Sequence, residues 1–274
     1  MAADSKPPPI TRKPRKAAEP TFDLILLGGG QSERFRAEAE GEATPKQFQI
    51  LGDAPVFIHA LRAFLSLGCF RQAIFAVPEE HEPLAQELMD EYLRDERKAV
   101  LRVVHGGTRR QDSSRIALEA AAELQPLPTR VVIHDACRPF LSAEFRERIR
   151  EKLYDRSLGA WIPTVPVVDT LKRVEEGQVV ETVDRGLLQR VQTPQIFDFE
   201  LIRGLAQKVY AEAPDRVFTD DASLCEDFGT KVGTFLGDPR NLKLTYRFEL
   251  ETLRLFFPEP RASAMGDSSP KLPS

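Results

Sequence analysis

The sequence predicts an α/β fold in which a mostly parallel, twisted sheet is flanked by helices. Short apolar runs of strand length alternate with segments of helical spacing between residues 22 and 165. This alternation is typical of consecutive βαβ units. Several of the runs end in glycine-rich or charged segments. Because ligands bind beyond the carboxyl ends of strands in such sheets, these segments are expected to cluster at one edge and form a site.

The expected elements follow from local pattern. Apolar runs predict strands at residues 22–27, 73–77, 100–104, 131–133 and 160–165. Helical spacing predicts helices at residues 55–67, 84–93, 116–124 and 145–153, and Gly68 is a typical stop signal after the first of them. Further along, helices are expected at residues 201–210, from Thr219 onward and near the end at Phe257, with a strand at 232–235.

Residues 166–192 interrupt the alternation. Two runs, 167–174 and 179–183, are separated by Glu176-Gly177, which predicts a β-hairpin with a glycine-containing turn. A two-stranded ribbon is marginal alone in water. We therefore expect a projecting hairpin arm that packs on a second copy in a twofold homodimer.

Both ends of the chain differ from the middle. Residues 1–20 are rich in Pro, Lys and Arg, and residues 258–274 are small, polar and proline-containing. Both segments are expected to be disordered, which leaves 21–257 as the folded domain. Since no apolar run approaches the roughly 20 residues of a spanning helix, no membrane partner is expected.

Charge and cysteine usage narrow the function. The net charge of −4 argues against a general nucleic-acid or anionic membrane surface, so a phosphate ligand would need a local basic pocket. The three cysteines, Cys69, Cys137 and Cys225, are widely spaced and odd in number. They form no metal pattern and no complete disulfide set, which favours a reducing cytoplasm.

The first strand breaks into Gly28-Gly29-Gly30 and is followed by Arg34 and Pro45-Lys46-Gln47. Glycine lets the backbone approach a ligand, and successive N–H groups can converge on an anion. A dinucleotide fingerprint is excluded because Glu33 stands where its third glycine belongs. A P-loop is excluded because no Gly-Lys-Ser/Thr triplet exists. A phosphate-binding loop of another type is predicted, with a tight turn and solvated charges as the alternative.

Other charged groups follow later strands: Arg109 and Arg110 with Ser113, Asp135 with Arg138, and Lys243. Asp135 directly follows an apolar strand, where an unpaired carboxylate would be costly. A metal ion or Arg138 is expected to compensate it, and a purely structural ion pair is the alternative. His134 is expected to be a packed strand-end residue and not a general base.

The sequence offers no nucleophile for covalent catalysis. It has no Gly-x-Ser-x-Gly elbow, no His-Glu-x-x-His and no cysteine at catalytic spacing from a histidine. Phosphoryl or nucleotidyl transfer fits, because it can proceed by positioning and charge stabilisation alone.

Nine short motifs follow one another between residues 22 and 257: Leu27-Gly28-Gly29-Gly30-x-x-x-Arg34, Pro45-Lys46-Gln47, Gly106-Gly107-x-x-Arg110-x-x-Ser113, His134-Asp135-Ala136-x-Arg138-Pro139, Pro166-Val167-x-Asp169-Thr170-x-Lys172, Thr182-x-Asp184-Arg185, Gln192-Thr193-Pro194-Gln195, Thr219-Asp220-Asp221-Ala222-Ser223 and Asn241-x-Lys243. In this order they resemble the family of cytidylyltransferases that make 4-diphosphocytidyl-2-C-methyl-D-erythritol from CTP and 2-C-methyl-D-erythritol 4-phosphate. The resemblance implies a Rossmann-like nucleotidyltransferase fold, Mg²⁺ as cofactor and a place in non-mevalonate isoprenoid precursor biosynthesis.

The resemblance also implies roles for single residues. Arg34 and Lys46 match the pair that stabilises the pentacoordinate α-phosphate, and Lys243 and Arg185 match the pair that positions the acceptor phosphate. Further sugar-phosphate or ribose contacts are implied for four residues: Asp135, Arg138, Thr170 and Thr219. The implied nucleotide pocket comprises Leu27, Gly28, Gly29, Gly30, Gly107, Thr108, Ser113 and Ala136. In that family the hairpin arm crosses to the neighbouring subunit, so Thr170 and Arg185 would serve the partner's site.

Two alternatives stay open. A sister enzyme that joins CTP to ribitol 5-phosphate or another polyol phosphate shares the glycine loop and the Asp-Ala-x-Arg-Pro segment. The arm motifs with Asp169-Thr170-x-Lys172 and Asp184-Arg185 favour methylerythritol phosphate. A catalytically inactive nucleotide-binding module is the alternative from another class, and release of pyrophosphate from CTP would distinguish it.

Overall fold

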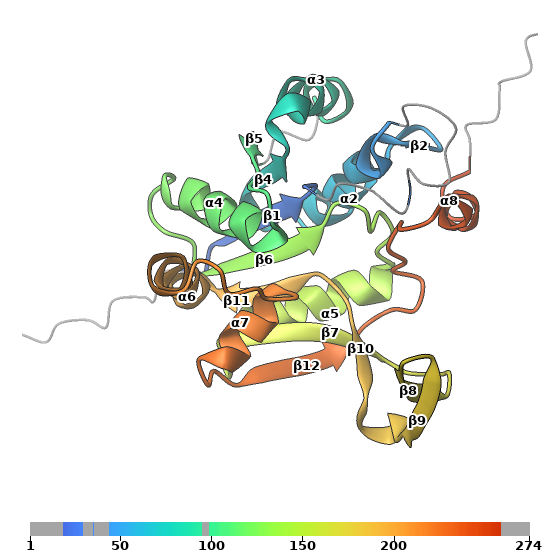
Figure 1. Cartoon of the computed structure of the whole chain (residues 1–274). Helices are drawn as coiled ribbons and strands as arrows, with labels where there is room; N and C mark the ends of the chain where they lie inside the picture. The colour runs from blue at the N-terminus through green and yellow to red at the C-terminus, as the bar shows by residue number, and fades with distance from the viewer. Residues whose placement is uncertain (1–18, 30–34, 36–43, 95–98, 259–274) are drawn as a thin grey trace, which may run out of the picture.

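The computed structural model describes residues 19–29, 35, 44–94 and 99–258. Gly30 and Arg34 of the glycine loop, and nearly all of the two chain ends that are expected to be disordered, lie outside these residues. Within the described part, no helix is both long and apolar enough to cross a membrane. Figure 1 shows the arrangement of the helices and strands.

The described residues form one eight-stranded sheet in the order β10-β7-β11-β6-β1-β4-β5, with β12 also paired to β7. Four strands pair in parallel: β1 (Phe22–Leu27), β4 (Phe70–Val77), β5 (Val100–His105) and β6 (Arg130–Asp135). The other half contains β7 (Ala160–Pro166), β10 (Gln189–Val191), β11 (Gln195–Asp198) and β12 (Val232–Leu236). Only β10 and β11 run against the common direction. The predicted mostly parallel sheet is therefore confirmed.

Helices cover both faces of this sheet (Figure 1). One apolar layer lies under α2 (Val56–Leu65), α3 (Glu82–Tyr92) and α5 (Ala143–Tyr154). The other lies under α4 (Arg110–Ala122), α6 (Phe199–Glu212) and α7 (Asp221–Asp227). Alternate residues of β1 serve the two layers: Leu24 and Leu26 join the first, and Ile25 and Leu27 the second. This is why β1 is apolar on both faces from Leu24 to Leu27.

Strand register brings the expected loops to one edge. Leu27, the last residue of β1, lies opposite Ala76 of β4 and Asp135 of β6. The end of β4 at Val77 lies opposite His105 of β5. The segments that follow β1, β5 and β6 therefore start side by side, as the sequence predicts.

A third and smaller cluster of buried apolar side chains lies beside this edge of the sheet. The helix α8 (Arg247–Arg254) contributes Leu250 and Leu253, which pack with Leu51 and Val56. Leu51 belongs to a short hairpin of β2 (Ile50–Leu51) and β3 (Ala54–Pro55), where Gly52 has the positive φ of +62° that the turn needs. The segment before α8 carries Lys243.

The predicted hairpin is present. Strands β8 (Leu171–Glu175) and β9 (Gln178–Val183) pair in antiparallel fashion, and Glu176 and Gly177 form the turn with φ of 50° and 80°. Positive φ at both central residues matches the right-handed twist of the flanking strands. The hairpin projects away from the main sheet (Figure 1). Its role in a dimer stays a prediction.

Two expectations about elements were wrong. The helix expected at residues 116–124 begins six residues earlier, because α4 starts at Arg110. The cause is a local cap: the Asp112 carboxylate accepts the backbone N–H and the guanidinium of Arg109, which starts the helix early. The second miss is β11, four residues that lie between β6 and β7 in the sheet and follow Pro194.

Candidate active site

A hollow of about 700 Å³, counted out to open solvent, lies at the carboxyl edge of the sheet. Its walls come from the end of β1, the short 3₁₀ helix Lys46–Phe48, the start of α4, the end of β6 and the segment before α8. The lining residues are Leu27, Gly28, Gly29, Lys46, Gln47, Thr108, Arg110, Ser113, Asp135, Ala136, Cys137 and Lys243. Nine of the residues predicted for the site thus meet at one place.

The glycine loop fits closely against the sheet. A Cβ on Gly28 would lie 2.6 Å from the Phe75 ring, so only glycine allows this path. The buried side chain of Gln47 donates to the Gly28 carbonyl over 2.8 Å. That bond ties the Pro-Lys-Gln segment to the loop and places Lys46 beside Gly28 and Gly29. Gln47 was not predicted as a site residue, although it belongs to one of the motifs.

The start of α4 forms another wall. A Cβ on Gly107 would lie 2.3 Å from Cβ of Asp112, so the chain can turn into the helix only with glycine there. The Ser113 hydroxyl lies 3.2 Å from the carbonyls of Gly107 and Arg109. Unpaired backbone N–H groups and the macrodipole make the start of a helix favourable for an anion.

Three cations surround the Asp135 carboxylate. Lys243 Nζ lies 2.9 Å from it, Arg138 Nε 3.4 Å and Arg110 Nε 3.6 Å. Burial alone would raise the pKa of Asp135, but Lys243, Arg110 and Arg138 lower it well below its usual range. Asp135 therefore stays ionised. The expectation that Arg138 compensates it is confirmed, and two further cations share the task.

Arg110 links this cluster to α7. Its Nη1 lies 2.6 Å from Asp221 Oδ2, and the Ser114 hydroxyl donates to the other oxygen of Asp221. Burial lowers the pKa of Arg110, but Asp221 and Asp135 raise it above its usual value, so the guanidinium stays charged. Asp221 was overlooked as a site residue, although it stands in the Thr219-Asp220-Asp221 motif.

His134 is fully buried at the end of β6. Burial lowers its pKa to about 4, so the ring is neutral near pH 7. Its two nitrogens lie 3.0 Å from Thr193 Oγ1 and from the Arg138 carbonyl. The prediction of a packed strand-end residue is confirmed.

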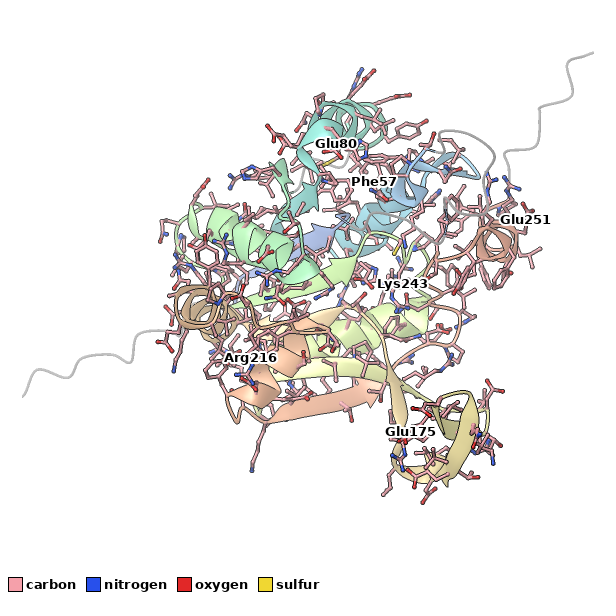
Figure 2. All side chains as sticks on the ribbon, in the orientation of Figure 1. Phe57, Glu80, Glu175, Arg216, Lys243 and Glu251 are labelled. Carbon is pink, nitrogen blue, oxygen red and sulfur yellow. The ribbon has the colours of Figure 1, made fainter. Side chains whose placement is uncertain are left out.

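Five described residues of the predicted site do not line this hollow. Gly107 and Arg138 lie next to it, since they contact Ser113 and Asp135, whereas Thr219, Thr170 and Arg185 have no hydrogen bond or ion pair with its lining. Thr219 is exposed and lies just before the Asp220 cap of α7. Thr170 and Arg185 are exposed at the base of the hairpin, where Arg185 donates to the Val168 carbonyl. Figure 2 shows Glu175 of the hairpin at the periphery, well away from Lys243. The fold of a single chain therefore leaves Thr170 and Arg185 outside the cluster.

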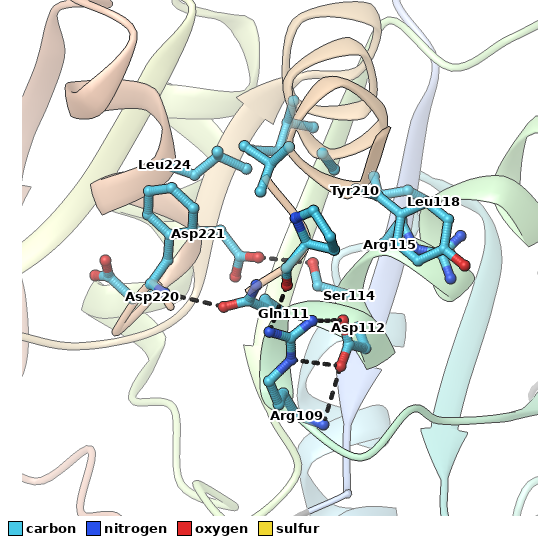
Figure 3. Close-up of a pocket in the computed structure, with 15 residues that line it drawn as sticks. Arg109, Gln111, Asp112, Ser114, Arg115, Leu118, Tyr210, Asp220, Asp221 and Leu224 are labelled. Carbon is cyan, nitrogen blue, oxygen red and sulfur yellow. Dashed lines mark hydrogen bonds and ion pairs between the residues drawn. The ribbon is translucent and has the colours of Figure 1, made fainter. Parts of the chain in front are cut away.

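A second cavity of about 460 Å³ lies between α4, α6 and α7 (Figure 3). Its polar groups are largely paired with one another. Arg109 forms two 2.8 Å contacts with Asp112 and donates to the Pro214 carbonyl, and Gln111 bonds the backbone of Arg216 and Phe218. These bonds hold the connection between α6 and α7, so Arg109 is structural here, whereas Arg110 serves the hollow.

The hollow combines a glycine loop, a helix start and a ring of lysines and arginines around a buried carboxylate, at the edge where parallel sheets bind ligands. The described hydroxyls that bond a histidine or a carboxylate near this edge, Thr193 with His134 and Ser114 with Asp221, are buried and do not line the hollow. The class defined by this fold and site is an α/β nucleotide-binding transferase that acts on phosphates. The family model described as 2-C-methyl-D-erythritol 4-phosphate cytidylyltransferase matches residues 24–256, and the chain belongs to this family of nucleotidyltransferases.

Known proteins agree with this assignment. The 2-C-methyl-D-erythritol 4-phosphate cytidylyltransferase of Bacillus cereus is 37% identical over 227 residues, which cover 82% of this chain and 92% of the relative. The bifunctional enzyme IspD/IspF of Bartonella bacilliformis is 35% identical over 234 residues, or 85% of this chain. This chain spans 55% of that relative's length. The crystal structure of 4-diphosphocytidyl-2C-methyl-D-erythritol synthase from Anaerococcus prevotii matches with a TM-score of 0.70 at 25% identity, over 86% of this chain and 98% of that one.

Proposed function

We propose that this chain transfers CMP from CTP to 2-C-methyl-D-erythritol 4-phosphate, which gives 4-diphosphocytidyl-2-C-methyl-D-erythritol and pyrophosphate. The reaction belongs to non-mevalonate isoprenoid precursor biosynthesis. One observation carries the proposal: the glycine loop, Lys46, Arg110 and Lys243 line a single hollow in a chain of this family.

The chemistry needs no strong base. The acceptor phosphate already carries an anionic oxygen, which attacks the α-phosphorus of CTP. A new P–O bond forms while the bond to the β-phosphate breaks, and pyrophosphate leaves with the electron pair. Because no proton has to be removed, the buried and neutral His134 is not needed as a base. Catalysis then depends on positioning and on charge stabilisation.

Lys46 is the cation best placed to stabilise the developing charge. It lines the hollow together with Gly28 and Gly29, and it forms no ion pair with a described carboxylate. It can therefore bind phosphate without breaking an existing contact. Arg34, which lies outside the described residues, is proposed to join it at the α-phosphate.

Lys243 and Arg138 are proposed to bind the acceptor phosphate. Asp135 fixes both side chains, since it contacts Lys243 over 2.9 Å and Arg138 over 3.4 Å. Lys243 is still 41% exposed, so its ammonium group can reach a ligand in the hollow. Groups that are fixed before the ligand arrives need little reorganisation in the transition state.

The hairpin arm is proposed to complete the partner's site in a homodimer. Val174 and Val179 are direct cross-strand neighbours, and both are exposed, as is Leu187. A second copy would cover these apolar side chains and could bring Thr170 and Arg185 to its own hollow.

Mixed dimers test this arm. In a mixture of Lys46→Ala and Arg185→Ala chains, each mixed dimer would have one site with both residues intact. Since about half of the dimers formed at random are mixed, the mixture should recover about a quarter of wild-type activity. No recovery after confirmed subunit exchange would show that Arg185 does not act across the dimer.

Mg²⁺ is proposed to enter with CTP, bound to triphosphate oxygens. The described residues contain no cluster of three or more His, Cys, Asp or Glu side chains that could hold a metal ion. Asp135 is already shared by three cations. Mg²⁺ commonly binds through substrate phosphates with few protein ligands, which fits such a site.

An assay of pyrophosphate release tests the function. CTP is offered with 2-C-methyl-D-erythritol 4-phosphate, with ribitol 5-phosphate, and without an acceptor. The proposal expects release that depends on methylerythritol phosphate and a product that contains CMP. Faster turnover with ribitol 5-phosphate would assign the chain to the sister activity. No release with either acceptor would favour an inactive nucleotide-binding module.

A further inference from the structure

Two buried residues connect the arm to the proposed acceptor site. Gln192 and Thr193 directly follow β10, the strand by which the chain returns from the hairpin. The Gln192 amide donates to the Asp238 carbonyl over 2.9 Å and accepts the Asp238 N–H over 3.1 Å. The Thr193 carbonyl accepts the Asn241 side-chain amide over 2.8 Å. The segment that returns from the hairpin is therefore bonded to the segment that carries Lys243.

The hydroxyl of Thr193 has a defined direction. The backbone N–H of Asp135 donates to Thr193 Oγ1 over 3.1 Å. The Arg138 carbonyl, 3.0 Å from His134 Nε2, can only accept, so the neutral ring carries its proton on Nε2 and donates it there. His134 Nδ1 is then an acceptor, and the Thr193 hydroxyl donates to it over 3.0 Å. The three bonds form one chain in which every donor has an acceptor.

This chain of bonds helps to join the two segments that form the proposed acceptor site, residues 134–138 and residues 241–244. Arg138 donates to the Asn241 carbonyl over 2.8 Å, and the Leu244 N–H donates to the Cys137 carbonyl over 2.8 Å. The residues between these contacts carry Lys243. Thr193 thus binds the backbone of Asp135 with its hydroxyl and the Asn241 side chain with its carbonyl. The 2.9 Å contact between Asp135 and Lys243 depends on both segments staying in place.

We propose that Thr193 is a positioning residue for the acceptor phosphate, which aligns Asp135 and Lys243 without touching the substrate. The inference rests on the proposed function. The nucleotide half of the hollow has its own supports: Gln47 holds Gly28, and the start of α4 holds Ser113. Loss of the Thr193 hydroxyl should therefore affect the acceptor far more than CTP.

The test replaces Thr193 by Val, which keeps the shape and removes the hydroxyl, and by Ser, which keeps the hydroxyl. The control is Thr129→Val. Thr129 Oγ1 also accepts a backbone N–H over 3.1 Å, from Thr21, but at the opposite end of β6. KM for each substrate, kcat and Tm are measured for all variants. Thr193→Ala, which leaves room for water, replaces Thr193→Val if the latter does not fold.

In Thr193→Val, we expect KM for methylerythritol phosphate to rise about tenfold, because the Asp135 N–H and His134 Nδ1 lose their partner. KM for CTP should change less than about threefold, and Thr193→Ser should stay close to wild type. Thr129→Val should lower Tm without this split. Equal changes in both KM values, or a loss of Tm alone, would overturn the positioning role. An inactive wild-type protein would instead refute the proposed function.

Discussion

Replacing Lys46 by Ala should lower kcat strongly while leaving the fold intact. Lys46 lines the hollow next to Gly28 and Gly29, and no ion pair to a described carboxylate holds it. Its removal leaves no buried carboxylate without a partner among the described residues. The usual cost of breaking a buried ion pair is therefore absent, and Tm should stay within a few degrees of wild type.

The magnitude follows from the charge. Two unit charges about 4 Å apart interact by roughly 4 kcal/mol at the effective dielectric of a partly shielded site. Part of that energy is also present in the ground state, so about 3 to 4 kcal/mol is the expected loss in the transition state. Since about 1.4 kcal/mol corresponds to a factor of ten, kcat should fall about 10²- to 10³-fold.

The assay is pyrophosphate release with saturating CTP and acceptor. Lys46→Arg is measured alongside, because it keeps the charge. Lys231→Ala is the control, since Lys231 is exposed just before β12, whose first residue pairs in parallel with the first residue of β7, at the edge of the sheet opposite the hollow. A kcat within about threefold of wild type in Lys46→Ala would refute the reasoning, because a stabilising charge of this kind cannot be lost at so small a cost.

Three further predictions concern the same edge of the sheet. Asp135→Asn should lower kcat/KM for the acceptor at least about 100-fold and also lower Tm, because three cations would lose their shared anion; added pyrophosphate should restore part of the Tm. Gly28→Ala should lower the free energy of chemical unfolding by about 1 to 3 kcal/mol, since the added Cβ would clash with Phe75. A Cβ at Gly204 in α6 would have nothing within 4 Å, so Gly204→Ala should raise the free energy of unfolding. His134 has its pKa lowered from 6.5 to about 4, so the unfolded chain binds more protons than the folded one between these values. Stability should therefore be lost as pH falls from about 6.5 to 4, and this loss should be smaller in His134→Gln; an equal loss in both proteins would contradict it.

Local pattern was sufficient for most of the fold. Apolar runs fixed the strands of the parallel half, and helical spacing with stop signals such as Gly68 located the helices between them. The missed strand β11 is only four residues long and follows Pro194, so it carries too little periodicity to be seen. Its place between β6 and β7 depends on pairing with distant strands, which no local signal encodes.

The site was predictable to the extent that it follows strand ends. Gly28 directly follows β1, Asp135 ends β6 and Ala136 follows it, so parallel register alone brings these residues together. Arg110 and Asp221 are different, because they stand 111 positions apart in the sequence. Their importance comes from a 2.6 Å contact that forms only when α4 packs next to α7. Only packing shows that Arg110 serves the hollow while its neighbour Arg109 caps a helix.

Charge accounting explains why the residues outside the cluster matter. Around the hollow, four described cations, Lys46, Arg110, Arg138 and Lys243, face two paired anions, Asp135 and Asp221, which leaves a net charge of +2. A triphosphate and a phosphate monoester together bring about −6. Arg34, Arg185 and one Mg²⁺ would supply the missing +4. In the proposed dimer, Arg185 from the partner chain would supply one of these charges when both substrates are bound. A chain that cannot dimerise is therefore expected to bind CTP yet lose the acceptor.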